Sequence, residues 1–320
     1  MKISLGVYPN ETPAQIIDSA KLAEKVGFDT LWMLDSHLLF REVYTMLGAL
    51  SVSTTKLRFG TAVTNPLTRH PTVTASAFST LHALSGGRAT LGISVGDSAL
   101  KAMNLEIAKM AELADTVVKI RALLGGQSAS FSGEDQAKLI FGNVDIPIYV
   151  AATGPKMLKM AGAMADGVIL MNGVAPELIE AAIALVREGE REAGRPNGET
   201  KMVVWAACHP SFDAVKYNVA RAILRNIPGP MDELTRTTAA KVREAYNYEQ
   251  HGRSEAEFGK IVPDAIVTRY AFAGDPSMIK GQIDALAPLG VDEVVLAIPV
   301  APEIKSRNDV MQELTPIISN

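Results

Sequence analysis

The order of strand and helix signals is the feature that most limits how this chain folds. Short apolar runs alternate with amphipathic segments of helical spacing along the 320 residues. Eight runs predict strands, at residues 3–7, 30–34, 57–63, 89–95, 146–151, 167–171, 202–207 and 293–298. Each is followed by a helical segment, and nearly continuous apolar runs are typical of parallel strands covered on both faces. We therefore expect a (β/α)8 TIM barrel.

The length fits one domain over residues 1–320, with extra chain inserted at about residues 210–264. We expect this insertion, which is the largest and lies in the seventh βα unit, to shape a substrate pocket. The side chains available to line it are Met231, Tyr246, Tyr248 and Phe258, with ordinary helix packing as the alternative. A doubly wound sheet is the alternative fold. Such a sheet usually carries a glycine-rich dinucleotide fingerprint after its first strand, where this chain reads VYPNETP.

Composition limits the class of partner. The net charge is −4 and no basic stripe is present, whereas nucleic-acid binding requires clustered Lys and Arg. The single cysteine, Cys208, excludes an intramolecular disulfide. The chain enters a strand pattern directly at its start, and no apolar run reaches the roughly eighteen residues of a membrane span. We therefore expect a cytoplasmic protein that acts on a small molecule.

Four expected strand ends are polar or rich in glycine, and in a barrel the chemistry takes place at the carboxyl ends of the strands. These ends are Asp35-Ser36-His37, Thr61 to Asn65, Gly96-Asp97-Ser98 and Ala151 to Pro155. The imidazole of His37 can exchange a proton near neutral pH, although a hydrogen-bonded loop histidine is the plainer alternative. Asp97 can bind a ligand hydroxyl or act as an acid, or it can cap a helix. No two histidines share a ligand-like spacing, so no metal site is expected.

A possible anion site follows the fifth strand. It comprises Ala152, Thr153, Gly154 and Pro155, which lie between a strand and a helix. Free backbone N–H groups, a hydroxyl and a helix dipole together favour a phosphate. An ordinary turn is the alternative, because Gly-Pro is common turn chemistry.

Several of these segments carry a resemblance to a known family. GTAVTNPLTRHP, TASAFSTLHALSGGRATLGISVGDS and AATGPKMLKMAGAMADGVILMNG resemble the bacterial luciferase-like flavin and deazaflavin oxidoreductase superfamily. Within it they most resemble the methylenetetrahydromethanopterin reductase-like members, which use coenzyme F420. GDPSMIKGQIDALAPLGVDEVVL is similar to the eighth unit of that family. Only residues 125–143 and about 210–264 fall outside the resemblance.

The resemblance implies a deazaflavin or flavin ring at the carboxyl ends of the strands, backed by a non-proline cis peptide that maps onto Ala62–Val63. Thr64 and Asn65 would line the same wall. Asp35 and His37 would lie at the ring edge, although deazaflavin members usually read Asp-His without the intervening serine. The expected cofactor-binding residues are Asp35, Ala62, Val63, Thr64, Asn65, Gly96, Asp97, Ala152, Thr153, Gly154 and Pro155, and the expected catalytic residues are His37 and Asp97.

The resemblance also implies the reaction. We expect hydride transfer between reduced coenzyme F420 and an organic acceptor. The alternative cofactor is flavin mononucleotide (FMN), which would make the protein a monooxygenase. A non-catalytic flavin-binding barrel is the second class that stays open. Members of the family commonly form homodimers, so a homodimer is expected here.

Overall fold

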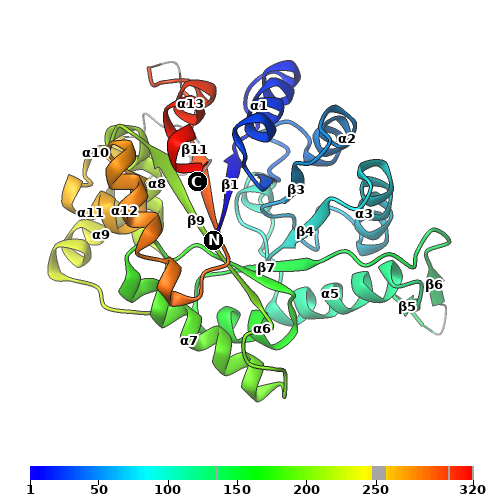
Figure 1. Ribbon diagram of the computed structural model, residues 1–320. Coiled ribbons are helices and arrows are strands. Elements are labelled where there is room, and N and C mark those ends of the chain that lie inside the picture. Colours follow the sequence, from blue (N-terminus) through cyan, green and yellow to red (C-terminus); the bar gives the residue numbers. More distant parts are fainter. Residues whose placement is uncertain (134–135, 247–256, 302, 319–320) are drawn as a thin grey trace.

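Eight parallel strands close into a barrel surrounded by helices (Figure 1). The computed structural model describes residues 1–133, 136–246, 257–301 and 303–318. The barrel strands are β1 (Lys2–Val7), β2 (Thr30–Met33), β3 (Arg58–Thr61), β4 (Ala89–Ile93), β7 (Ile148–Ala152), β8 (Gly167–Leu170), β9 (Lys201–His209) and β11 (Glu293–Ile298). Closure is complete because β9 pairs with both β8 and β11. The predicted TIM barrel is confirmed.

Helices surround the barrel, and several of them start and end where local signals place them. They are α1 (Pro13–Val26), α2 (Val43–Ser53), α3 (Pro71–Ser85), α4 (Ser98–Lys101), α5 (Met110–Leu124), α6 (Pro155–Met164), α7 (Pro176–Glu192), α12 (Pro276–Asp284) and α13 (Arg307–Ile318). In α1 the side chain of Thr12 caps the first turn in a capping box with Gln15. Gly27 ends the helix with φ 100°, a conformation that favours glycine.

Three helices are shorter than their sequence patterns suggest. The helix expected over residues 105–124 starts only at Met110, since the Lys109 N–H is bonded to the Glu112 carboxylate and the Ala108 N–H to the Val95 carbonyl. The helix expected over 276–289 ends at Asp284, and a separate 3-10 turn, Ala287–Leu289, contains Pro288. The helix expected over 302–318 begins at Arg307.

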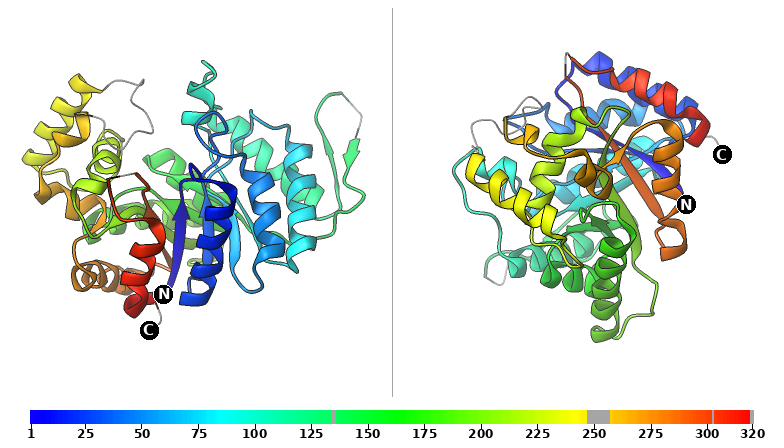
Figure 2. Two further views of the ribbon diagram at one scale, coloured as in Figure 1. Left: turned by 90° about the horizontal axis from the view of Figure 1, so that it is seen from above. Right: turned by 90° about the vertical axis from the view of Figure 1, so that its left-hand side faces the viewer.

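The predicted insertion lies between β9 and β11. It contains α8 (Asp213–Ile223), α9 (Glu233–Ala245), α10 (Glu257–Lys260) and α11 (Asp264–Tyr270), and the short strand β10 (Phe272–Ala273) that follows pairs with β9. The insertion helices lie opposite a small hairpin, β5 (Ser128–Ser130) and β6 (Gln136–Lys138) (Figure 2). Tyr248 and His251, which the sequence pattern places in this insertion, lie outside the described residues.

The interior of the barrel is filled by side chains. Trp32, Ile169, Val203 and Val295 are almost fully buried there. The indole N–H of Trp32 donates to the carboxylate of Glu293 at 2.7 Å. A filled interior leaves the ends of the strands as the place for a ligand. Within the described ranges, no helix combines the length and apolar character needed to cross a membrane.

The end of β3 lies unusually close to β4. A Cβ atom at Gly92 would lie 1.9 Å from the carbonyl oxygen of Thr61, so only glycine fits. The Thr61 hydroxyl donates to the Gly92 carbonyl at 2.7 Å, and the Gly92 N–H reaches the same hydroxyl at 3.1 Å. This contact fixes the course of the chain immediately before Ala62 and Val63.

The Gly92→Ala substitution is expected to lower the free energy of unfolding by about 1–3 kcal/mol, because the added methyl group forces the β3 and β4 backbones apart. Gly281→Ala in α12 is the matched control, since no atom lies within 4 Å of the added methyl group. The control should be neutral or stabilising by up to about 1 kcal/mol, because alanine is the better helix former. Urea unfolding of both variants measures this difference, and equal stability would contradict the close contact.

Candidate active site

A cavity of about 390 Å³ opens at the carboxyl ends of the strands. This volume lies within the range of ordinary ligand sites. The ends of β1, β2, β3, β4, β7, β8 and β9 all contribute to its lining, together with helix α8. The cavity therefore lies at the polar strand ends where the sequence predicts the site.

One wall of the cavity is built by the segment after β3. The peptide bond between Ala62 and Val63 is cis, as the resemblance predicts. Ala62, Val63 and Asn65 line the cavity. Thr64 is fully buried behind them, where its N–H donates to the Gly92 carbonyl at 3.0 Å and its hydroxyl accepts a hydrogen bond from Tyr44 at 3.0 Å. Thr64 therefore supports the wall and does not line the cavity.

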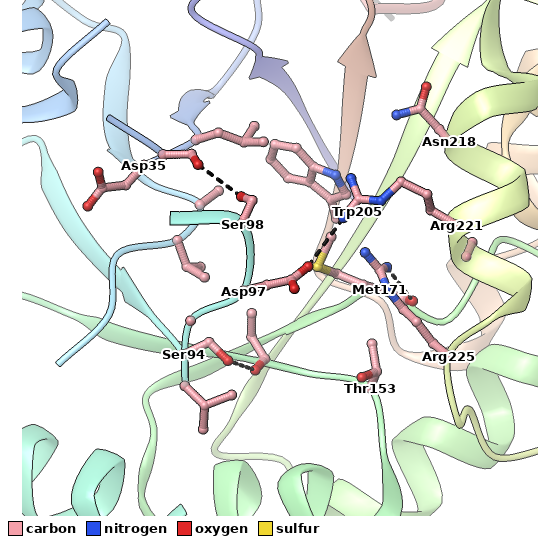
Figure 3. Close-up of a pocket in the computed structure, with 18 of the residues that line it drawn as sticks. Asp35, Ser94, Asp97, Ser98, Thr153, Met171, Trp205, Asn218, Arg221 and Arg225 are labelled. Carbon is pink, nitrogen blue, oxygen red and sulfur yellow. Dashed lines mark hydrogen bonds and ion pairs between the residues drawn. The ribbon is translucent and has the colours of Figure 1, made fainter. Parts of the chain in front are cut away.

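Asp35 lies at the end of β2 on the same side of the cavity (Figure 3). Burial raises the pKa of its carboxyl group, and the charge of Glu42 adds to this effect. A hydrogen bond with Thr64 and the charges of Arg69 and His37 oppose the increase without cancelling it. Its Oδ2 atom is buried and has no hydrogen-bond partner in the described part of the chain. A buried carboxyl oxygen left in this state is suited to a ligand donor.

His37 does not line the cavity, and its side chain is exposed. Ser36, the residue between Asp35 and His37, is buried and places its hydroxyl 3.0 Å from that of Ser98. The serine that interrupts the usual Asp-His pair thus lines the cavity, while the histidine lies outside it.

Asp97 follows β4 and lies at the start of α4, but its side chain makes no capping bond. Its carboxylate contacts Lys101 Nζ at 2.6 Å and Arg221 Nη2 at 3.2 Å. Burial alone would raise the pKa of Asp97. The hydrogen bond and charge of Lys101, together with the charges of Arg221 and Arg225, outweigh burial and lower this pKa. Asp97 and the preceding Gly96 both line the cavity.

The loop after β7 contributes the possible anion site. Ala152 and Thr153 line the cavity, and α6 starts directly behind them at Pro155. Gly154 is the N-cap of this helix and has no side chain to cap its free N–H groups. The start of a ten-residue helix thus lies beside the cavity. This arrangement suits an oxyanion, and phosphate above all.

Helix α8 of the insertion supplies lining residues that were not singled out in the sequence. Asn218, Arg221, Ala222 and Arg225 all line the cavity. Their spacing of three, one and three residues places them on one helical face, which is the signal in the sequence that could have identified them. The expected lining residues Met231, Tyr246 and Phe258 do not line it. In particular, Phe258 is fully buried against the rings of Tyr217 and Tyr246.

Two aromatic residues, one on a barrel strand and one directly after a strand, also belong to the site. Trp205 of β9 lines the cavity, although its place in an apolar strand predicts only a packing role. Tyr8 follows β1, and its hydroxyl accepts a hydrogen bond from Asn218 at 3.0 Å. Burial raises the pKa of Tyr8 to about 12, although the charge of Arg221 opposes this. The phenol is therefore protonated at neutral pH and can donate a hydrogen bond. Within the described ranges, no three His, Cys, Asp or Glu side chains are arranged to hold a metal ion.

The two cavity carboxylates are expected to affect stability in opposite directions. Asp35 has a raised pKa, so its ionisation opposes folding above the unfolded pKa of about 4, and Asp35→Asn should raise the unfolding temperature at pH 7. Asp97 has a lowered pKa, so its ionisation stabilises the fold, and Asp97→Asn should lower the unfolding temperature at pH 7.

Thermal unfolding between pH 3 and 8 measures both effects, and each variant serves as the control for the other. The gain from Asp35→Asn should vanish below about pH 4, where the carboxyl is protonated in both the folded and unfolded states. The loss from Asp97→Asn should shrink as the pH falls through the folded pKa of Asp97. Shifts of the same sign at pH 7 would contradict this description of the two sides of the cavity.

Comparison with known proteins yields several full-length relatives. The family model described as luciferase-like monooxygenase matches residues 2–293. A 5,10-methylenetetrahydromethanopterin reductase of Methanolobus tindarius is 32% identical over 313 residues, which cover 94% of this chain and 95% of the relative. An F420-dependent glucose-6-phosphate dehydrogenase of Nakamurella multipartita is 34% identical over 203 residues, covering 57% of this chain and 60% of the relative.

Solved structures give the same result for the fold. The coenzyme F420-dependent tetrahydromethanopterin reductase of Methanopyrus kandleri superposes with a TM-score of 0.80 at 27% identity, covering 99% of each chain. The match thus extends over the barrel and its insertion alike. The chain therefore belongs to the luciferase-like monooxygenase family.

Proposed function

We propose that this protein is an oxidoreductase that transfers hydride between coenzyme F420, a deazaflavin, and an organic acceptor in the cavity at the carboxyl ends of the strands. The observation that carries the proposal is the cavity at the strand ends, whose lining combines the apolar Ala62 and Val63 with the cationic residues in and just after α8. The Methanopyrus and Nakamurella relatives, whose names both include F420, support this choice of cofactor.

The residues around the cavity fit a flat, anionic cofactor. Ala62 and Val63 offer an apolar surface for the face of the ring, and the unpartnered Oδ2 of Asp35 is available to a polar group at its edge. Asn65, Gly96 and Asp97 complete the polar lining near this wall. Ala152, Thr153, Gly154 and Pro155 form the helix start that would receive a phosphate.

When bound, reduced deazaflavin supplies a hydride from carbon and reacts little with oxygen. The protein then has to bind the acceptor and manage its proton. Asp97, kept ionised by Lys101 and Arg221, can accept a proton from a substrate hydroxyl but has none to give at neutral pH. In the reducing direction, we propose Tyr8 as the hydrogen-bond donor to the acceptor and His37 as a proton source at the exposed rim.

The acceptor is proposed to be a small organic molecule, as for the relatives that act on methylenetetrahydromethanopterin or glucose 6-phosphate. An FMN-dependent monooxygenase is the alternative within the same family, and a non-catalytic binding barrel is the other. The monooxygenase differs from the proposed enzyme in its cofactor, and the binding barrel differs in that it does not consume reduced cofactor.

Fluorescence titration of the purified protein with F420 and with FMN tests the choice of cofactor. F420 is expected to bind, and Gly154→Asp is expected to weaken its binding at least tenfold by placing a carboxylate at the anion site. Aspartate is favoured at an N-cap, so this variant should fold and keep α6 intact. Gly281→Asp on α12 serves as the matched control. Tight binding of FMN with none of F420 would refute the proposed cofactor.

Steady-state turnover of reduced F420 with a panel of acceptors tests the proton partners. His37→Ala and Tyr8→Phe are each expected to lower kcat about tenfold to a hundredfold while F420 affinity stays the same. Circular dichroism and cofactor titration of both variants check that each remains folded and loaded. Turnover of His37→Ala equal to wild type would remove His37 from the mechanism, and the same result for Tyr8→Phe would remove Tyr8.

A further inference from the structure

The face of α8 turned toward the cavity is polar and strongly cationic (Figure 3). Asn218 and Arg221 lie on it, and Arg225 lies just beyond the end of the helix, where its backbone N–H donates to the Ala222 carbonyl at 3.1 Å. Asn218 is fixed by its bond to the Tyr8 hydroxyl at 3.0 Å. Arg221 is fixed by its ion pair with Asp97 at 3.2 Å. The Arg221 guanidinium therefore stands at a defined place on the cavity wall, and Arg225 lines the same cavity.

The charges on this wall do not balance. Asp97 is shared between Lys101 and Arg221, and Arg225 forms no ion pair with any carboxylate in the described part of the chain. The one hydrogen bond of the Arg225 guanidinium among those residues is a long contact from Nη1 to the Met171 carbonyl at 3.4 Å. Burial and the neighbouring Arg221 charge lower the pKa of Arg225 to about 10, which still leaves it charged at neutral pH.

We propose that Arg225, flanked by Arg221, forms a subsite for an oxyanion, either a carboxylate or a phosphate group, of the ligand that occupies the cavity. A half-buried cation that has no ion-pair partner of its own is favourably paired by an anionic ligand. The planar guanidinium has five N–H donors in a fork that matches two oxygens of one anion. A neutral ligand would leave most of these donors unpaired.

The subsite adjoins the start of α6. The carbonyl oxygen of Asn226, next to Arg225 in the chain, lies 3.5 Å from the position of a Cβ atom on Gly154. Thr153 and Arg225 line the same cavity. An oxyanion bound there would come either from the phosphate of the cofactor side chain or from an acidic group on the acceptor. Both sources offer the same chemistry to Arg225.

Calorimetric titration of the cofactor-free full chain with inorganic phosphate, at constant ionic strength, tests the subsite. Arg225→Met is expected to weaken phosphate binding about tenfold to a hundredfold, as for a lost charge-assisted hydrogen bond. Arg225→Lys keeps the charge but not the fork, so it should show intermediate affinity. Arg236→Met, which removes an exposed arginine of α9, is the matched control and should bind as wild type does. No phosphate binding by wild type, or equal binding by Arg225→Met, would overturn the proposal.

Titration with F420 and with its deazariboflavin core, which lacks the phosphate, then identifies the source of the oxyanion. Weaker binding of F420 but not of the core by Arg225→Met would assign the subsite to the cofactor. Unchanged binding of both, alongside weaker binding of phosphate, would assign it to an acidic acceptor. The inference rests on the proposed function for the cavity, but the phosphate titration requires no deazaflavin. If the wild-type protein bound neither F420 nor its core, the proposed cofactor would be wrong, but the phosphate titration would still test the subsite.

Discussion

The close contact between Thr61 and Gly92 is the constraint on which the rest of the cavity depends. It holds the end of β3 against β4 through two hydrogen bonds and leaves no room for a side chain at position 92. The next residues, Ala62 and Val63, therefore turn into the cavity as its wall, and Thr64 is bonded behind them to Gly92 and Tyr44. The position of the surface that a ligand ring would contact is therefore fixed by contacts between the β3 and β4 backbones.

Around this wall, the cavity has two electrostatically different sides. On one side the Oδ2 atom of Asp35 is buried, has no hydrogen-bond partner in the described part of the chain, and is open to a ligand donor, and burial raises the pKa of this carboxyl group. On the other side Asp97 is ionised between Lys101 and Arg221, and Arg225 adds a further cation. A ligand with a hydrogen-bonding ring edge and a separate acidic group matches both sides. An anionic cofactor with a flat ring has this form.

The fold could be predicted from the sequence because its determinants are local. Apolar runs set the strands, and signals such as the Thr12 capping box and the left-handed Gly27 set the helix ends. The strand-end residues of the site followed from the barrel, and the cis Ala62–Val63 bond followed from family resemblance. The helical spacing of Arg221 and Arg225 places them on one face, but it does not show that this face is turned toward the cavity, because that depends on how α8 packs against β9 and α10. The exposure of His37 could not be predicted either. Ser36, and not His37, is buried beside the cavity, because Ser36 forms tertiary contacts such as the hydrogen bond with Ser98.

The central claim is that a deazaflavin ring binds against the wall at Ala62 and Val63, with its phosphate toward Thr153 and Gly154. A crystal structure of the protein with bound F420 tests this claim most directly. The account predicts the ring in contact with both wall residues, one ring-edge group near Asp35, and the phosphate at the start of α6. A ring bound elsewhere, or a cavity that accepts only flavin mononucleotide, would contradict it.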